Sequence, residues 1–370
     1  MEHPLETNSS LHKHLPVLGV LGRRLFLAVL KFFGVFWLAR RWSAGKLRII
    51  AWQGLSSSDE HEYDDATFLR PQTFARRLEL LAHMGATVLP LDEAMDRLAR
   101  GTLPALPVVL TIDGGWASSA GPMADALSRA GFPATLYVAT DSTRRPFWPV
   151  YEVAVGWLLW RAGQTGRQAP VDLAPVDPRA GTLDLSTEAQ RQEALAKLRA
   201  LGPSLNLVER THLVTALAEA LGEDLGSAAL QSADYDALGT LAARGVDVQL
   251  HTHRRRMPPT EAQLSAELDL NRAHLRRASP RSLKHLSFPE GEYRPEQLDW
   301  LPRLGVSTAV TRKPGLNDAR TPRLELRRFV DRERLSALEL EATLCGVPEY
   351  LRSLRARRNP ALRPVGAQTT

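Results

Sequence analysis

Apolar and polar positions along the chain follow two alternating patterns. Short apolar runs typical of buried strands recur, and stretches with helical spacing separate them. This repeated strand, helix, strand order predicts an α/β fold whose parallel sheet is joined by crossover helices. The predicted strands are 47–51, 87–91, 107–112, 134–139, 246–250, 284–288 and 307–311, and the predicted helices between them include 71–84, 92–100 and 117–130.

The pattern changes between about residues 144 and 230. A Trp-rich stretch is followed by a Pro- and Gly-rich linker and by charged amphipathic stretches at 188–201 and 207–221. Because the alternation resumes afterwards, we predict that 144–230 is a helical insertion and that one sheet spans it. The predicted parts are an N-terminal tail and basic amphipathic helix at 1–46, the sheet-forming domain at 47–347, and a basic C-terminal tail at 348–370.

The segment from Leu15 to Trp42 is apolar and aromatic. Arg23-Arg24 and Lys31 interrupt it, so it lacks the ~18–20 uncharged residues of a spanning helix. The arginine pair resembles an export signal, but Lys31 breaks the apolar region and Arg40-Arg41 replaces small cleavage-site residues, so a cytoplasmic or membrane-peripheral location is favoured over export. We expect a helix at about 25–42 that packs on the domain. The alternative is a peripheral helix on an anionic membrane.

Composition narrows the function classes. Hydrophobic residues make up 44% of the chain and charged residues 24%, which excludes a polytopic membrane protein and a largely disordered chain. The net charge of +6 lies mostly in short Arg runs, so no nucleic-acid partner is expected. The single cysteine, Cys345, cannot form an intrachain disulfide, and any metal would need His and carboxylate ligands.

Two predicted loops carry candidate chemistry. Asp113 leaves a buried apolar strand just before two glycines, so it is either a site carboxylate or a turn-capping residue. Farther along, Gln249, His251 and His253 fall on one face of a predicted strand. Two imidazoles on a buried face indicate a ligand or catalytic site, and a hydrogen-bonded histidine pair at a strand end is the alternative.

Four sequence motifs point to one family. The segments V-L-T-I-D-G-G-W at 109–116, G-F-P-A-T-L-Y-V at 131–138, Q-L-H-T-H-R-R-R at 249–256 and H-L-S-F-P-E-G at 285–291 occur in this order. Together they resemble the polysaccharide deacetylases with a NodB homology domain, carbohydrate esterase family 4. The resemblance covers most of 47–347, and it implies a distorted (β/α)7 barrel with the helical insertion beside it.

The resemblance also implies a set of functional residues. In this family one Asp acts as general base, a second Asp and two His hold a divalent metal, commonly zinc, and a later His is the general acid for hydrolysis of N-acetyl groups on amino-sugar polymers. Asp113 matches the base and His251 the first histidine ligand. Gly114 stands at the second Asp and Arg255 at the second His, and no histidine follows His285.

Other positions of the family's cleft have counterparts here. The resemblance puts Gln53, Trp116, Pro289 and Gly291 in the cleft. Ser287 stands where many members have an arginine that pairs with the base. We therefore expect a cleft that keeps its shape but has lost its metal.

These departures predict a degraded metal site. We expect no metal in the native site and weak metal binding at most, with His253 as a possible substitute ligand. We also expect Arg255 to occupy the metal's space and pair with Asp113. Two hypotheses follow: a pseudoenzyme that binds an amino-sugar glycan or an active paralogue through the old cleft, or an active divergent hydrolase of C–N (amide) bonds with an altered metal site.

Overall fold

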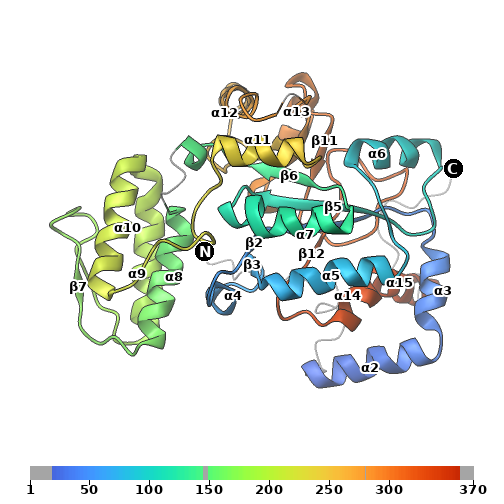
Figure 1. The fold of residues 1–370 in the computed structure, drawn as a ribbon, viewed down its shortest axis with the longest axis horizontal. Coiled ribbons are helices and arrows are strands. Elements are labelled where there is room, and N and C mark those ends of the chain that lie inside the picture. Colours follow the sequence, from blue (N-terminus) through green and yellow to red (C-terminus); the bar gives the residue numbers. More distant parts are fainter. Residues whose placement is uncertain (1–18, 145–148, 280, 359–370) are drawn as a thin grey trace.

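A single parallel sheet organises the computed structural model, which describes residues 19–144, 149–279 and 281–358 (Figure 1). The strand order is β11-β10-β9-β6-β5-β1-β12, and the short β4 (Thr87–Val88) pairs with β5. Every pairing in this sheet is parallel. The strands are β1 (Arg48–Trp52), β5 (Pro107–Gly114), β6 (Thr135–Val138), β9 (Asp247–Leu250), β10 (His285–Ser287), β11 (Thr308–Val310) and β12 (Phe329–Val330).

The two edges of the sheet approach each other through the segment 326–330. Leu326 forms a bridge with Val310 of β11, and Phe329 of β12 pairs with Ile50 of β1. The sheet therefore curls into a distorted barrel, and the predicted fold class is confirmed.

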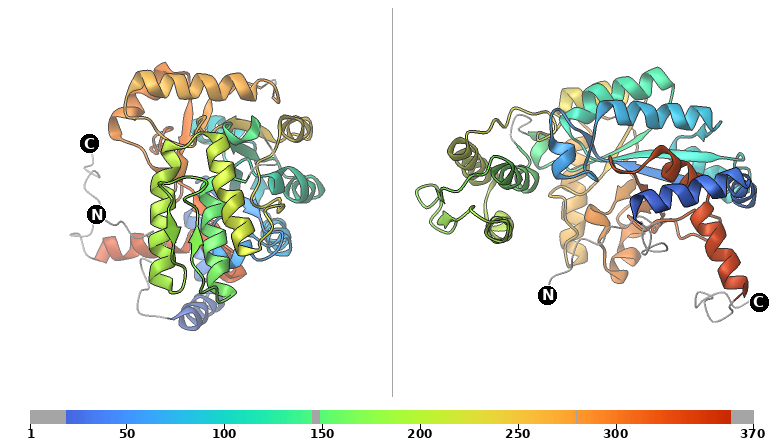
Figure 2. Two further views of the ribbon diagram at one scale, coloured as in Figure 1. Left: turned by 90° about the vertical axis from the view of Figure 1, so that its left-hand side faces the viewer. Right: turned by 90° about the horizontal axis from the view of Figure 1, so that it is seen from below.

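Helices cover the outside of the sheet (Figure 2). Smaller elements are α4 (Glu60–Tyr63), the parallel pair β2 (Gly54–Leu55) and β3 (Phe68–Leu69), and a π-helical turn, η1 (Ser119–Met123), that runs directly into α7. The helices around the barrel are α5 (Pro71–His83), α6 (Leu91–Arg100), α7 (Ala124–Ala130), α11 (Tyr235–Ala243), α12 (Glu261–Leu275), α13 (Pro295–Arg303) and α14 (Ala337–Leu344).

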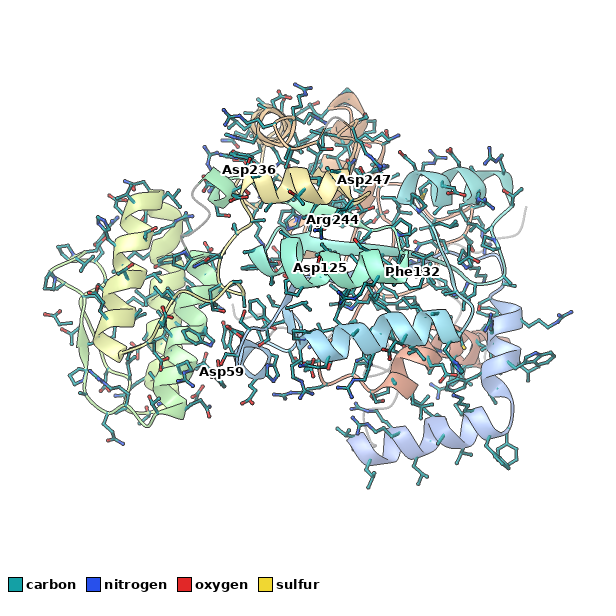
Figure 3. The ribbon with its side chains drawn as sticks, in the orientation of Figure 1. Asp59, Asp125, Phe132, Asp236, Arg244 and Asp247 are labelled. Carbon is teal, nitrogen blue, oxygen red and sulfur yellow. The ribbon has the colours of Figure 1, made fainter. Side chains whose placement is uncertain are left out.

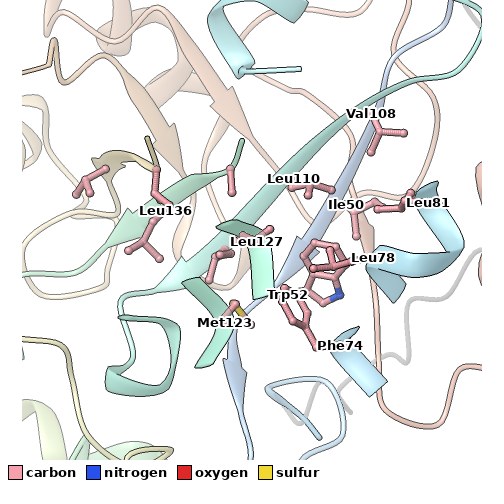
Figure 4. Close-up of a cluster of buried hydrophobic side chains, with 14 of the residues drawn as sticks. Ile50, Trp52, Phe74, Leu78, Leu81, Val108, Leu110, Met123, Leu127 and Leu136 are labelled. Atoms are coloured by element: carbon pink, nitrogen blue, oxygen red, sulfur yellow. The ribbon is translucent and has the colours of Figure 1, made fainter. Parts of the chain in front are cut away.

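Alternation along the strands creates two buried layers. Ile50 and Trp52 of β1 face α5, where Trp52 packs edge-on against Phe74 with ring centroids 5.0 Å apart (Figure 4). Ile49 of the same strand belongs to a separate inner cluster that also contains Val109 of β5. Because successive side chains point to opposite faces, the odd-numbered residues of β5 face the barrel interior. That alternation directs Asp113 inward.

The insertion forms a helical unit beside the barrel. It contains α8 (Tyr151–Gln164), α9 (Glu188–Leu201) and α10 (Leu207–Leu221), and a small hairpin of β7 (Val171–Asp172) and β8 (Thr182–Leu183). These elements share a hydrophobic core of their own. Both α9 and α10 have the bounds predicted from sequence, and each begins with a capping box. Arg161 of α8 binds Asp59, which lies between this unit and the barrel (Figure 3).

The N-terminal segment forms two helices where one was predicted. Gly34 has a positive φ of 72° and separates α2 (Val20–Phe32) from α3 (Val35–Trp42). Of these, α2 contacts α14, and α3 contacts α15 (Val347–Arg358), into which the predicted C-terminal tail extends. The rest of that tail and residues 1–18 lie outside the described residues. No described helix has the length and hydropathy needed to cross a membrane.

Candidate functional site

Inward-facing polar residues meet at the carboxyl end of the sheet. Strand pairing aligns Asp113 of β5 with Tyr137 of β6, and Tyr137 with Gln249 of β9. His251 follows two residues after Gln249, and Ser287 links it to Asp113, because Ser287 contacts both His251 and Arg328, and Arg328 binds Asp113. The structure therefore brings together Asp113 and His251, as the sequence predicted.

Arg328 binds both oxygens of the Asp113 carboxylate. Its Nη1 and Nη2 donate to Oδ1 and Oδ2 of Asp113 at 2.8 and 2.7 Å, and both side chains are buried. Burial alone would raise the pKa of the Asp113 carboxyl group, but the Arg328 guanidinium lowers it to about 2. Asp113 is therefore a carboxylate fixed in a bidentate ion pair.

Arg328 corrects one prediction. Sequence analysis expected Arg255 to pair with Asp113, but Arg328 already binds both carboxylate oxygens. Its Nη2 also donates to Ser287 Oγ at 3.1 Å. Ser287 stands where the resemblance expects an arginine, so an arginine from the segment before β12 reaches the same place.

His251 presents one free ring nitrogen. Its Nδ1 lies 2.9 Å from the Ser287 carbonyl oxygen, which only accepts hydrogen bonds, so we assign the proton to Nδ1. Nε2 is then an acceptor, and it is buried without a hydrogen-bond partner. Burial lowers the pKa of His251 to about 4, although the Asp113 carboxylate opposes this shift. The neutral imidazole is therefore the form present near pH 7.

His253 does not join His251. The strand β9 ends at Leu250, and Thr252 has a positive φ of 59°, so the predicted alternation stops before His253. Its Nδ1 lies 2.9 Å from Thr140 Oγ1, and its ring stacks on His274 with centroids 5.2 Å apart. The prediction that His253 shares the face of His251 is therefore wrong.

Arg255 enters the site by a different route from the one predicted. Its Nη2 donates to Glu290 Oε1 at 2.9 Å and to Gln53 Oε1 at 3.3 Å. Its guanidinium carbon lies 5.8 Å from the centroid of the Trp116 ring. Arg255 is therefore held by a carboxylate, an amide and an aromatic face, and its positive charge also helps to lower the pKa of His251, after burial.

Trp116 fills the space beside Gly114. A Cβ atom added at Gly114 would lie 2.6 Å from Trp116 Nε1, and the glycine has a φ of 106°. The indole is buried, and it packs edge-on against Phe68 at a centroid distance of 5.6 Å. The indole therefore occupies the space that a side chain at position 114 would need.

Glu290 is a functional candidate that the sequence did not reveal. It accepts from Arg255, and its Oε2 accepts from Arg312 Nη1 at 2.7 Å. Partial burial would raise the pKa of Glu290, but the guanidinium groups of Arg255 and Arg312 lower it. Pro289 and Gly291, both predicted for the cleft, flank it, and a Cβ at Gly291 would lie 2.9 Å from Arg312.

Backbone strain is concentrated in the loops that follow β9 and β10. Among the residues described, the non-glycine residues with positive φ are Thr252, Arg255 and Glu290, at 59°, 52° and 53°. The first two lie in the loop after β9 and the third in the loop after β10. Such conformations cost about 1–3 kcal/mol each and concentrate at functional sites. The strain therefore marks these loops independently of the sequence motifs.

The polar atoms at the site do not form a three-ligand metal set. Three buried nitrogens, Trp116 Nε1, His251 Nε2 and Arg255 Nε, have no hydrogen-bond partner. Only the imidazole nitrogen is a ligand atom, and the oxygens of Asp113 are bound to Arg328. In residues 19–144, 149–279 and 281–358, no three His, Cys, Asp or Glu side chains are grouped to hold a metal ion.

Solved structures share this architecture. Neither a protein-family model nor a curated relative matches the sequence. The Streptococcus pyogenes deacetylase PplD in complex with acetate is 16% identical, with a TM-score of 0.54 over 81% of this chain and 98% of that chain. The putative polysaccharide deacetylase BA0330 from Bacillus anthracis is 12% identical, with a TM-score of 0.51 over 81% of this chain and 69% of that chain. A de-N-acetylase from Aggregatibacter actinomycetemcomitans is 11% identical, with a TM-score of 0.50 over 80% and 99%.

The chain has the polysaccharide deacetylase fold. At these identities the likeness establishes the fold alone. Within the polysaccharide deacetylase fold, Asp113 and His251 stand at the carboxyl end of the strands, where catalytic groups of such barrels gather.

Proposed function

We propose that the protein is a catalytically impaired relative of the polysaccharide deacetylases that binds an amino-sugar glycan at the carboxyl end of its barrel. The observation that carries this proposal is the setting of Arg255, which binds Glu290 and Gln53 at the position of a histidine ligand. A guanidinium is a permanent cation, so it repels a divalent ion instead of binding it. The indole beside Gly114 removes room for a second ligand.

Glycan binding accounts for the polar groups that remain. A buried donor or acceptor without a partner costs about 1–3 kcal/mol, and four such atoms lie in this site: the three nitrogens and the Tyr137 hydroxyl oxygen. Sugar hydroxyl groups both donate and accept, so they suit the Arg255 N–H as well as the His251 acceptor nitrogen. Glu290 and Arg312 retain exposed fractions of 51% and 29%, so they are the groups a polymer would meet first. An active paralogue is the alternative occupant of this surface.

Binding of a defined oligosaccharide tests the proposal. Titration calorimetry with an N-acetylglucosamine oligomer should show saturable binding, and Glu290→Gln should weaken it about tenfold because it removes the ionic partner of Arg255 and Arg312. Arg320→Ala is the matched control, since Arg320 is 90% exposed and pairs with Asp318. Absence of saturable binding, or equal binding by both variants, would overturn the proposal.

An active divergent deacetylase is the second candidate. Two observations favour it. The Asp113 carboxyl group is ionised, as a general base must be, and His251 Nε2 is an acceptor without a hydrogen-bond partner. Release of acetate from the same oligomer separates this candidate from the first. Acetate release that requires added zinc or cobalt supports an altered metal site and contradicts impaired catalysis.

A further inference from the structure

The helices α2 and α3 expose an apolar face. Of the eleven exposed large hydrophobic residues among those described, eight lie between residues 20 and 38. Leu21, Phe32, Phe33 and Trp37 expose 82%, 85%, 72% and 64% of their surface. Singly exposed apolar residues are ordinary, but a contiguous set marks an interaction surface. This outer face consists of Val20, Leu21, Leu25, Val29, Phe32, Phe33, Trp37 and Leu38.

The fold does not need the outer face. In α2, Leu21, Leu25 and Phe32 recur at helical spacing, whereas Leu27 on the opposite side is only 1% exposed. In α3, Phe36 and Ala39 are buried while Trp37 and Leu38 point outward. Each helix therefore packs through one side and presents a second apolar side to its surroundings.

Cations border the outer face. Residues 19–46 contain six Lys and Arg and no Asp or Glu. Arg24 and Lys31 lie 4.0 and 2.6 Å from carboxylates of α14, yet their side chains remain 46% and 50% exposed. Arg41 is exposed at the end of α3. Apolar and aromatic area rimmed by Lys and Arg is the pattern of a helix that lies in a membrane interface.

We propose that the outer face of α2 and α3 binds the surface of an anionic lipid bilayer. The exposed cations Arg24, Lys31 and Arg41 complement acidic headgroups, whereas a second copy of this chain would bring the same cations together. The 13 residues of α2 span only ~20 Å, less than the ~30 Å hydrocarbon core, so the described helix lies on the bilayer and does not cross it. Phe32, Phe33 and Trp37 surround the bend at Gly34, where they would enter the interface.

Membrane binding would leave the candidate site free. The helix α3 leads into the amino end of β1, whereas Asp113 lies at the carboxyl end of β5. The insertion lies on the opposite side of the barrel from α2 and α3 (Figures 1 and 2). A bilayer against the outer face would therefore not cover the Asp113 and His251 region.

Vesicle flotation tests this inference on the full chain. Vesicles of phosphatidylcholine containing about one third phosphatidylglycerol should carry the protein at low salt, and binding should fall when phosphatidylglycerol is omitted or salt is raised, because both reduce the attraction of the cations. Replacing Phe32, Phe33 and Trp37 together by Ser should lower the partition coefficient by at least about tenfold. Val208→Ser/Leu270→Ser is the matched control, because these residues are 41% and 39% exposed on other elements.

The outcomes decide between lipid and self-association. Circular dichroism melts check that the triple variant is folded, and Phe33→Ser alone, at 72% exposure, is a milder substitute if it is not. Failure of the parent to float with anionic vesicles overturns the inference, as does equal flotation of a folded Ser variant. A dimer in sedimentation velocity that the Ser variants abolish, without lipid binding by the parent, would assign the face to a second copy and also overturn it.

Discussion

His251 and His285 are buried imidazoles on neighbouring parts of one sheet, but their surroundings differ. His285 begins β10 at the amino end of the strands, where its Nδ1 lies 2.7 Å from Thr308 Oγ1 and its Nε2 lies 3.1 Å from Asp92 Oδ1. His251 follows β9 at the carboxyl end, and its Nε2 has no partner. Neither Nε2 has a hydrogen-bond partner, but that of His285 lies within ion-pair distance of the Asp92 carboxylate, whereas that of His251 is a buried acceptor available to a ligand.

The backbone supports the same contrast. Loops at the carboxyl end hold the described non-glycine residues with positive φ, Thr252, Arg255 and Glu290. Such strain lowers stability and persists only where surrounding contacts impose it. The strained loops therefore indicate a functional role for the carboxyl end of the barrel. The contrast between the two ends leads to predictions about the carboxyl end, beginning with the largest effect.

The first prediction concerns the buried ion pair. Arg328→Met should lower the free energy of unfolding by about 3–5 kcal/mol, because it leaves the buried Asp113 carboxylate without its cation. Adding Asp113→Asn should recover part of this loss. Urea denaturation measures both, and Arg320→Ala at an exposed pair should cost at most about 1 kcal/mol. Equal losses for Arg328→Met and Arg320→Ala would mean that Asp113 is not held as described.

The second prediction concerns the indole beside Gly114. Gly114→Ala should cost about 2–4 kcal/mol, since it adds a Cβ against Trp116 Nε1 at a φ of 106°. Gly131→Ala isolates the backbone contribution, because Gly131 has a φ of 67° with nothing within 4 Å of a Cβ, and it should cost about 1 kcal/mol. Thermal or urea unfolding compares the two. Similar losses would show that Trp116 does not fill this space.

The third prediction concerns pH. The pKa of His251 falls from its ordinary value of 6.5 to about 4 in the folded protein, because burial disfavours the imidazolium. Unfolding therefore takes up a proton in this range, so the stability from neutral His251 is complete above pH 6.5 and is lost as the pH falls towards 4. His251→Asn should reduce the difference in unfolding free energy between about pH 7 and pH 5 by about 1–2 kcal/mol.

Urea titrations at both pH values measure this difference, and the exposed His83→Asn is the matched control. An unchanged pH dependence in His251→Asn would contradict the buried, neutral imidazole at the carboxyl end.

The smallest expected effect is on metal binding. Gly114→Asp/Arg255→His restores the residue types that the family resemblance expects, yet the indole and the positive φ at position 114 should keep the new carboxylate from meeting His251. Zinc should therefore raise the melting temperature of the double variant no more than that of the parent. A large zinc-dependent rise in a folded double variant would show that only the ligands, and not the space around them, had changed.

Sequence patterns predicted the sheet well because its strands are buried apolar runs. The predicted strands 107–112, 134–139 and 246–250 correspond to β5, β6 and β9. The strand β12 (Phe329–Val330) was missed because two residues give no periodic signal, and Arg328 was missed with it. An arginine directly before an apolar pair was the only hint of this inward-facing cation.

The site was predicted only where strand alternation decides orientation. Asp113 lies near the end of a regular strand, and Gln249 and His251 are two residues apart on the predicted face of another. Because side chains alternate along a strand, the sequence could predict that Asp113 and His251 lie close together. Beyond Leu250 the positive φ values of Thr252 and Arg255 redirect the chain, so neither the contacts of His253 nor the pairing of Arg255 with Glu290 could be predicted from spacing.

Acetate release tests the central claim most directly. The purified full chain is incubated with an N-acetylglucosamine oligomer and zinc or cobalt, and acetate is compared with that from the Asp113→Asn variant, whose carboxylate position would be the base by family resemblance. With Arg255 held by Glu290 and Asp113 held by Arg328, we predict no acetate above the Asp113→Asn background. Metal-dependent acetate release by the parent that Asp113→Asn abolishes would contradict the account.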